Sequence, residues 1–221
     1  TEIIFILDRS GSMAGLEMDT IGGYNATIEK QKAQQGQAVV STILFNHYSK
    51  VICNRVDINE VKKMDENDYQ VYGSTSLLDA VGGAIVHVEK VHKLLGKANC
   101  PEKTIFIITT DGYENSSKEF SYKKVKSLIN KHDDYQFIFM GANIDAYQVA
   151  SDIGISKDTT VNYCCDSQGQ RLCFNSIDNA ISDIRKNGKI KSNSWRAESD
   201  NYYNKNTKIR KESSPMSKEK V

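Results

Sequence analysis

The chain of 221 residues lacks any run of about 20 consecutive apolar residues, which excludes a membrane-spanning helix. It also lacks a basic N-terminal segment followed by an apolar stretch and a cleavage site, so no secretory signal is visible. The 29 Lys and Arg residues nearly balance the 28 Asp and Glu residues, so the net charge indicates neither nucleic acid nor a membrane surface as a partner. Thr1 is a residue that removal of an initiator Met exposes, and we expect a cytoplasmic protein.

Cysteine pairs with the spacing of a zinc site or a disulfide framework are also missing. The five cysteines are an odd number at irregular spacing, and no CxxC pair occurs. We interpret them as reduced, mostly buried thiols. The alternative is a redox or metal role for the group formed by Cys164, Cys165 and Cys173.

Apolar residues make up 39% of the chain, which is enough for a core. Four apolar segments rich in branched and aromatic residues predict buried strands: residues 3–7, 39–45, 105–109 and 136–140. Apolar residues at steps of three and four predict helices over residues 78–95, 122–132 and 174–184, the last ended by Gly188. We also expect a first helix over residues 14–34, a short helix over 145–153 and a further strand near 159–164.

The connections between these elements predict the fold class. Only "NHYSK" separates strand 39–45 from the next candidate strand, 51–57, and this linker is too short for a crossover helix. These two strands should pair antiparallel, at one edge. Elsewhere strands and helices alternate, which predicts an α/β fold with a mostly parallel, doubly wound sheet and helices on both faces.

The composition changes after Gly188. Residues 189–221 hold nine Lys and Arg residues against four Asp and Glu residues, with many Ser and Asn residues. We therefore expect one domain over residues 1–188 and a basic, flexible C-terminal tail over 189–221. The alternative is a basic arm that touches nucleic acid or an acidic partner, with aromatic residues available for stacking.

Polar side chains with oxygen atoms follow the predicted strands at one edge of the sheet. Asp8, Ser10 and Ser12 follow the first strand in "DRSGSM", and Asp111 follows strand 105–109 in "TTDGYENSS". Thr75 lies in "YGSTSLLDA", in the loop before the helix that starts near Leu77. Ligands in open α/β sheets bind beyond the carboxyl ends of the strands, so we expect these oxygens to lie together.

This set of donors suits a hard divalent cation. Mg²⁺ prefers six oxygen ligands, keeps several waters and takes one or two carboxylates, and Mn²⁺ or Ca²⁺ are further candidates. Neutral hydroxyl ligands would leave the cation short of negative charge. We therefore expect it to take one more anionic oxygen, which an Asp or Glu side chain of a protein partner would supply.

The same residues carry a resemblance to a known family. "DRSGS" resembles the Asp-x-Ser-x-Ser signature of von Willebrand factor A-type (VWA) domains, and Thr75 and Asp111 fall where that family completes its metal-ion-dependent adhesion site. The resemblance spans residues 2–188, and "GSTSLLDA" resembles stretches of bacterial members. It implies a Rossmann-like fold with a divalent cation at the top and binding of protein partners through a metal-bridged carboxylate. Extracellular relatives usually carry signal peptides and often disulfides, so an intracellular assembly or regulatory role is expected here.

Four further polar residues follow strands at the same edge and could form a partner-binding rim. Glu114 and Asn115 follow Asp111, while Asn143 and Asp145 follow strand 136–140 in "GANIDA". The alternative for these four is ordinary turn and cap chemistry.

Purely structural roles are also open to the predicted metal ligands. Ser10 or Ser12 could cap the first helix, Ser76 and Asp79 resemble a capping box, and Asp-Gly is a common turn dipeptide at Asp111. Taken singly, each of these roles is reasonable. They do not account for the arrival of all five oxygen donors at one edge of the sheet.

We do not expect an enzyme. Metal-dependent phosphoester hydrolases of the haloacid-dehalogenase type carry an Asp-x-Asp pattern at the end of the first strand. This chain has Asp8 in the first position of that pattern but Ser10 in the second, so the general acid is missing. A serine hydrolase needs a base beside the nucleophile, and only His47 lies near that edge. His92 and His132 lie on apolar helix faces and are interpreted as packing residues. No GxxxxGK[ST] phosphate loop occurs.

Overall fold

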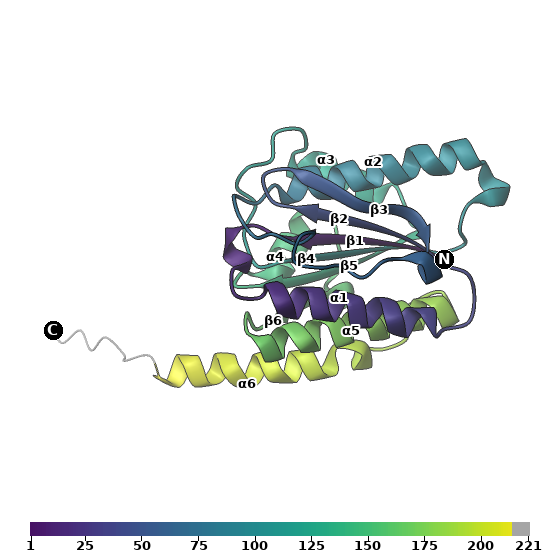
Figure 1. Ribbon diagram of the computed structural model, residues 1–221. Helices are drawn as coiled ribbons and strands as arrows, with labels where there is room; N and C mark the ends of the chain where they lie inside the picture. The colour runs from purple at the N-terminus through teal and green to yellow at the C-terminus, as the bar shows by residue number, and fades with distance from the viewer. Residues whose placement is uncertain (214–221) are drawn as a thin grey trace.

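The computed structural model describes residues 1–213, and its centre is a six-stranded sheet (Figure 1). The strands are β1 (Glu2–Asp8), β2 (Val39–Phe45), β3 (Ser49–Asp57), β4 (Thr104–Thr110), β5 (Tyr135–Ala142) and β6 (Thr160–Tyr163). Their order is β3-β2-β1-β4-β5-β6, and all neighbours are parallel except β2 and β3, which form an antiparallel hairpin at one edge. The predicted α/β class and the predicted sheet are confirmed.

The two central strands, β1 and β4, are apolar on both sides because helices cover both faces of the sheet. Every residue of β1 and of β4 is buried. In β1, Ile3, Phe5 and Leu7 belong to the core on one face. Ile4 and Ile6 belong to the core on the other face. Continuous apolar runs are therefore the expected sequence pattern here, and alternation is not.

The helices divide between the two faces (Figure 1). The first face carries α1 (Glu17–Lys32) and α5 (Ser167–Asn187), and the second carries α2 (Leu77–Leu95), α3 (Tyr122–Asn130) and α4 (Ala146–Asp152). Short 3₁₀ helices occur at Gly11–Met13, Ile58–Glu60, Lys97–Asn99, Lys157–Thr159 and Asn193–Arg196. No helix within residues 1–213 combines the length and the apolar character needed to cross a bilayer.

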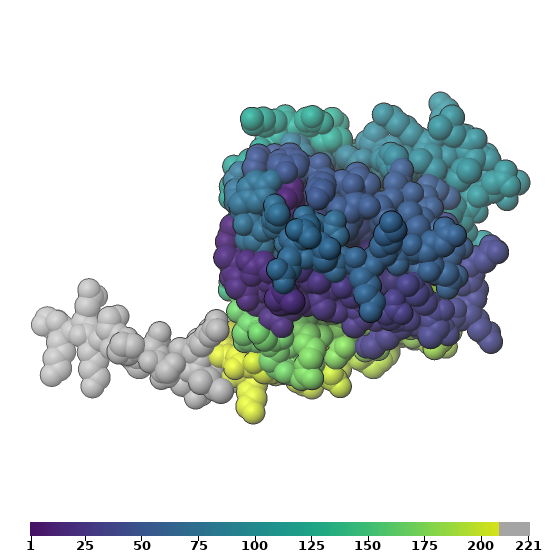
Figure 2. All heavy atoms as spheres, in the orientation of Figure 1, coloured from purple at the N-terminus to yellow at the C-terminus, as the bar shows by residue number. Residues whose placement is uncertain are grey.

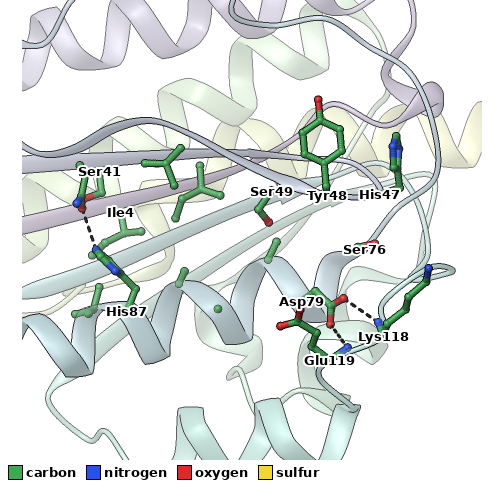
Figure 3. A pocket seen from close by; sticks show the side chains of 17 residues that line it. Ile4, Ser41, His47, Tyr48, Ser49, Ser76, Asp79, His87, Lys118 and Glu119 are labelled. Atoms are coloured by element: carbon green, nitrogen blue, oxygen red, sulfur yellow. Dashed lines mark hydrogen bonds between the residues drawn. The ribbon is translucent and has the colours of Figure 1, made fainter.

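The carboxyl ends of the parallel strands meet at one end of the molecule. In Figures 1 and 2 this is the left end, where the purple segment after β1 reaches the surface. A cavity of about 610 Å³ lies between α2 and the hairpin of β2 and β3 (Figure 3). Ile4, Ile43 and Val88 line its apolar part, and Ser76 and Asp79 line the end where α2 begins.

The segment predicted to be a flexible tail forms a further helix, α6 (Ala197–Ser213), which packs against α5 and β6. Trp195, just before α6, is only 3% exposed and belongs to the core. Arg196 Nη1 donates to the carbonyl oxygens of Lys157 at 2.9 Å and of Thr160 at 2.5 Å. The predicted flexibility does not hold for this described part of the segment, because a buried aromatic residue and a buried guanidinium anchor it. The domain boundary at residue 188 stays a prediction. Residues 214–221 of the predicted tail lie outside the described residues.

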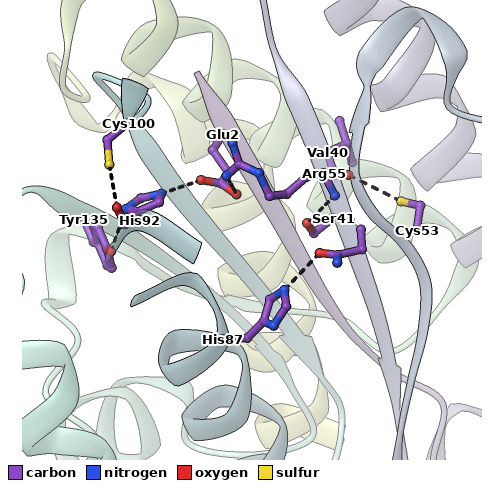
Figure 4. Close-up of polar contacts among 10 residues, drawn as sticks. Glu2, Val40, Ser41, Cys53, Arg55, His87, His92, Cys100 and Tyr135 are labelled. Carbon is purple, nitrogen blue, oxygen red and sulfur yellow. Dashed lines mark hydrogen bonds and ion pairs between the residues drawn. The ribbon is translucent and has the colours of Figure 1, made fainter. Parts of the chain in front are cut away.

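A buried carboxylate organises the opposite end of the sheet (Figure 4). Glu2 is fully buried, and its carboxylate accepts a hydrogen bond from Arg55 and lies 2.7 Å from His92 Nε2. The other ring nitrogen of His92 lies 3.0 Å from the hydroxyl of Tyr135. His132 is likewise engaged, 2.6 Å from Glu89. The interpretation of both histidines as packing residues with satisfied partners is confirmed.

Candidate metal centre

Two aspartates mark the carboxyl ends of neighbouring parallel strands. Asp8 is the last residue of β1, and Asp111 directly follows β4. The two strands pair in register, with Leu7 opposite Thr109, so both carboxylates emerge at the same edge. Both residues are buried, Asp8 with 0% and Asp111 with 2% of its surface exposed.

The two serines join these aspartates through a chain of hydrogen bonds. The backbone N–H of Ser10 donates to Asp8 Oδ1 at 2.7 Å, and Ser10 Oγ lies 3.1 Å from Ser12 Oγ. Ser12 Oγ in turn donates to Asp111 Oδ1 at 2.5 Å. Ser10 makes no side-chain capping bond, and α1 begins only at Glu17. The alternative that these serines cap the first helix is therefore wrong.

Thr75 reaches the same place from the loop before α2. A Cβ atom built on Gly112 would lie 3.1 Å from Ser12 Oγ, 3.2 Å from Thr75 Oγ1 and 4.0 Å from Ser10 Oγ. The hydroxyls of Ser10, Ser12 and Thr75 thus surround a small space directly beside Asp111. This space is open because Gly112 has no side chain. Of the five predicted oxygen donors, Ser12 is exposed and the other four are buried.

Thr110 supports the site and was not among the predicted residues. Its Oγ1 donates to Asp8 Oδ2 at 2.6 Å, so both oxygens of Asp8 accept a hydrogen bond. The hydroxyl of Tyr69 donates to the main-chain carbonyl of Asp8. Thr110 precedes Asp111 in the sequence, which was a local signal for it, but nothing in the sequence pointed to Tyr69.

Burial dominates the electrostatics of the two carboxylates. It raises the pKa of Asp8 to about 6, although hydrogen bonds from Thr110 and Ser10 favour the charged form. It also raises the pKa of Asp111, against the hydrogen bond from Ser12. Among the side chains of residues 1–207, which the structure describes, neither carboxylate forms an ion pair with a Lys, Arg or His residue. Buried charges of one sign without a partner are costly, and a divalent cation would offset both.

Glu114 and Asn115, two of the predicted rim residues, tie the loop after β4 to the loop before α2. Asn115 Oδ1 accepts from the backbone N–H of Thr75 at 2.8 Å, and the backbone N–H of Asn115 donates to the carbonyl of Thr75 at 3.0 Å. The carboxylate of Glu114 accepts from the backbone N–H groups of Leu78 and Ser117, at 2.9 and 2.7 Å. These bonds hold Thr75 in place, and partner contact by either residue stays a prediction.

The capping box suggested for Ser76 and Asp79 does not form. Ser76 Oγ instead pairs with Ser116 Oγ at 2.8 Å. The carboxylate of Asp79 accepts from the backbone N–H groups of Lys118 at 2.8 Å and Phe120 at 2.8 Å. The N-terminus of α2 and the loop after β4 therefore cap each other across the chain, an arrangement that local sequence patterns do not contain.

Asn143 and Asp145, the other two predicted rim residues, are exposed at the end of β5. Asp145 caps α4 by accepting from the backbone N–H of Gln148 at 3.1 Å. A thiol lies closer to the site: Cys165 Sγ is 3.8 Å from Asp111 Oδ2. None of the five cysteines forms a disulfide, and only Cys164 and Cys173 are buried, so the expectation of mostly buried thiols is wrong for the other three. No group of three His, Cys, Asp or Glu side chains within residues 1–207 could hold a metal.

Within residues 1–207 no histidine forms a hydrogen bond with the side chain of Ser10. The side-chain hydroxyl of Ser10 pairs with Ser12. The ring of His47 instead contacts those of Tyr48 and Tyr72, with centroid distances of 5.0 and 5.7 Å. The arrangement of oxygens is suited to ligation of a cation, and the serine hydroxyl that donates to a carboxylate here is that of Ser12, to Asp111.

No family model matches the chain, and a search of curated proteins also finds no match. Solved structures do match. A mussel byssus protein, proximal thread matrix protein 1 with a zinc-occupied MIDAS motif, aligns over 80% of this chain and 44% of its own with a TM-score of 0.56 and 13% identity. The manganese-loaded TRAP protein of Plasmodium vivax aligns over 78% of this chain and 71% of its own with a TM-score of 0.53 and 16% identity.

A third match is the von Willebrand factor type A protein of Catenulispora acidiphila, which aligns over 80% of this chain and 42% of its own with a TM-score of 0.52 and 13% identity. This chain has the VWA fold. At these identities the likeness concerns the fold alone, and the chain spans less than half the length of the mussel protein.

Proposed function

We propose that this VWA domain binds a divalent cation and, through it, an acidic side chain of a protein partner. Asp8, Ser10, Ser12, Thr75 and Asp111 would hold the cation. Mg²⁺ is the cation that this set of hard oxygens fits best, with Mn²⁺ and Ca²⁺ as further candidates. When bound, the cation supplies a positive charge to which a carboxylate from outside can ligate.

The observation that carries this proposal is the convergence of hydroxyls beside two buried, unpaired carboxylates. Ser10, Ser12 and Thr75 surround the open space at Gly112, and Ser12 links it to Asp111. Hydroxyls are neutral ligands, so only the two aspartates would offset the charge of the cation. Ser12 is exposed, so the centre opens to solvent on its side, where a partner can approach.

The chain's own residues prepare this centre before any ligand arrives. Thr110 and the backbone of Ser10 orient the two oxygens of Asp8, and Asn115 fixes the backbone of Thr75 from both sides. Such supporting hydrogen bonds hold metal ligands in position and lower the cost of ordering them on binding.

Titration calorimetry with MgCl₂ and MnCl₂ tests the cation site. We expect binding by the wild-type chain and at least about tenfold weaker binding by Asp111→Asn. Asp133→Asn is the matched control. Asp133 is exposed in the turn before β5, so it lies at the amino-terminal ends of the parallel strands, away from the candidate metal centre at their carboxyl ends. Absence of binding at millimolar Mg²⁺ and Mn²⁺, with the protein folded, would contradict the proposal.

A second measurement tests the partner chemistry. A short glycine-rich peptide with one aspartate should bind the domain at least about tenfold more tightly in Mg²⁺ than in EDTA, whereas the same peptide with asparagine should bind no more tightly in Mg²⁺ than in EDTA. Equal binding of both peptides would count against carboxylate ligation. The cytoplasmic location and the intracellular regulatory role stay predictions.

A further inference from the structure

A buried arginine lies between two of the proposed metal ligands in the chain. Arg9 separates Asp8 from Ser10, and only 2% of its surface is exposed. Its guanidinium carbon lies 4.8 Å from the ring centroid of Tyr48 and 5.1 Å from that of Tyr72. We call Arg9, His47, Tyr48 and Tyr72 the arginine–tyrosine cluster.

Within residues 1–207, whose side chains the structure describes, Arg9 forms no ion pair. Its Nη1 donates a long hydrogen bond to the carbonyl oxygen of Gln70 at 3.4 Å. Its Nε and Nη2 atoms are buried without a hydrogen-bond partner in this part of the chain. Buried guanidinium groups are normally paired, because an unpaired buried charge and unsatisfied donors both cost free energy.

The outer face of the cluster is made of two phenol groups. Tyr48 is 45% exposed and Tyr72 is 40% exposed, and their hydroxyl oxygens lie 2.5 Å apart. Figure 3 shows the ring of Tyr48 on the turn after β2, beside that of His47, with both rings pointing away from α2. The hydrogen bond with Tyr72 and the nearby charge of Arg9 lower the pKa of the Tyr48 hydroxyl, which makes it a better hydrogen-bond donor.

The cluster and the metal centre are built on the same loops. The backbone N–H of Tyr72 donates to the carbonyl of Arg9 at 3.0 Å. The backbone N–H of Gly11 donates to the carbonyl of Gly73 at 2.9 Å. Gly73 has a φ of +79° and leaves no room for a Cβ atom, which would lie 2.4 Å from His47 Nδ1. A partner bound at Ser12 and Thr75 would therefore also lie close to the tyrosines.

We propose that the arginine–tyrosine cluster is a second anion subsite, which receives another carboxylate of the partner whose first carboxylate ligates the cation. This proposal rests on the proposed function. One tyrosine hydroxyl donates to the other, so the hydroxyl that accepts this bond keeps its own proton free to donate to the second carboxylate, and the nearby charge of Arg9 would balance that carboxylate. The partner is then a segment with two acidic residues a few positions apart, because an extended chain advances about 3.3 Å per residue.

Short glycine-rich peptides test the subsite. One series carries two aspartates separated by one, two or three glycines, and the matched series carries asparagine in place of either aspartate. With the full chain in Mg²⁺, we expect one spacing of the two-aspartate peptides to bind about fivefold more tightly than its single-aspartate partners. Equal affinity at every spacing would overturn the subsite while leaving cation ligation intact.

Variants test whether the tighter binding of the two-aspartate peptide, called the gain below, depends on the arginine–tyrosine cluster. Tyr48→Phe combined with Tyr72→Phe removes both hydroxyls and keeps both rings, and we expect it to abolish the gain. Arg9→Gln should also abolish the gain, because it removes the positive charge. If Arg9→Gln does not fold, the double tyrosine variant by itself tests the subsite. Tyr122→Phe, at a tyrosine 38% exposed on α3, should keep the gain. A gain that survives the double variant would overturn the proposal.

Two further arms distinguish an anion subsite from a surface that binds aromatic groups and from an effect of the cation alone. A peptide with one aspartate and a tyrosine in the second place should show no gain, and a gain would mean that the tyrosines bind aromatic groups instead. In EDTA, a single-aspartate peptide should still shift the ring signals of Tyr48 and Tyr72 in NMR spectra. This shift tests the anion subsite even if no peptide binds through a cation. Absence of the shift in both EDTA and Mg²⁺ would overturn the proposal.

Discussion

Ser12 Oγ donates a hydrogen bond to Asp111 Oδ1 at 2.5 Å, although the two residues are 99 positions apart in the chain. The bond exists because β1 and β4 are parallel neighbours, so the segments that follow them leave the sheet at the same edge. Cation-dependent binding by this domain would depend on that juxtaposition, because it brings the hydroxyls that follow β1 beside the carboxylate that follows β4.

Replacement of Thr110 by valine should weaken Mg²⁺ binding about tenfold, because Thr110 Oγ1 orients Asp8 Oδ2 and favours its charged form. Thr109→Val is a close control. The hydroxyl of Thr109 is buried without a hydrogen-bond partner among the described residues, so its loss should leave affinity unchanged and stability unchanged or higher. Calorimetry and urea unfolding of both variants check this, and equal loss of affinity in the two would refute a specific role for Thr110.

Gly112→Ala should weaken cation binding more than it weakens folding. The added Cβ atom would lie 3.1 Å from Ser12 Oγ and 3.2 Å from Thr75 Oγ1, in the space that the hydroxyls surround. We expect about a tenfold loss of affinity for Mg²⁺. Gly22→Ala is the matched control in the interior of α1, where a Cβ atom meets nothing within 4 Å; it should stabilise the chain by about 0.5–1 kcal/mol and leave affinity unchanged. Unchanged affinity in Gly112→Ala would show that the cation does not sit at this space.

Cation binding should strengthen as pH rises through the pKa of Asp8, about 6, because the ligand is the carboxylate. At pH 5 only about one in ten of these groups is ionised, so affinity should be about tenfold lower than at pH 7.5. The sign is opposite for the protein in EDTA. The pKa of Asp8 is higher in the folded chain than its ordinary 3.8, so the folded state binds more protons between these values and loses stability as pH rises from about 4 to 6.

Thermal unfolding at several pH values, in EDTA and in Mg²⁺, measures both effects. The difference in melting temperature between the two conditions should grow with pH across this window. A difference that stays constant from pH 5 to pH 7.5 would mean that Asp8 does not compete with protons for the cation.

Trp195→Ala should destabilise the domain by about 3–5 kcal/mol, because Trp195 is 3% exposed and belongs to the core that α5 and β1 share. Leu94→Ala is the control, since Leu94 is 88% exposed on α2 and should matter by less than about 0.5 kcal/mol. Urea unfolding of both variants decides the point. A flexible segment after Gly188 would make the two variants indistinguishable.

Most of the fold follows from the sequence, because its central strands and its helices leave strong periodic patterns. The apolar runs of β1 and β4 and the three- and four-residue spacing in α2 and α5 require only local reasoning. The position of α6 does not. Its residues are mostly polar, and what holds the segment is Trp195 in the core and Arg196 on the carbonyls before and within β6.

The same distinction holds for the candidate site. Asp8, Ser10 and Ser12 form a local motif, and strand order brings Asp111 beside them. The supporting groups have no such signature. Glu114 is predicted as a partner contact because it is an acid after a strand, and that stays a prediction; the bond that its carboxylate accepts from the backbone N–H of Leu78, in the first turn of α2, has no signal in the sequence.

The arginine–tyrosine cluster is the part of the structure that the sequence predicts least. Arg9 is an unspecified position in the Asp-x-Ser-x-Ser pattern, and its stacking on Tyr48 and Tyr72 joins three loops. Such contacts depend on how the turns cross over the end of the sheet, and residue spacing within one loop does not determine that.

The most direct test of the central claim is a crystal structure of the chain grown with MnCl₂, with anomalous data collected at the manganese edge. We predict one strong anomalous peak beside Gly112, with oxygens of Ser10, Ser12 and Thr75 or of the two aspartates in its coordination shell. An ordered site without such a peak, or a peak held by other residues only, would contradict the account.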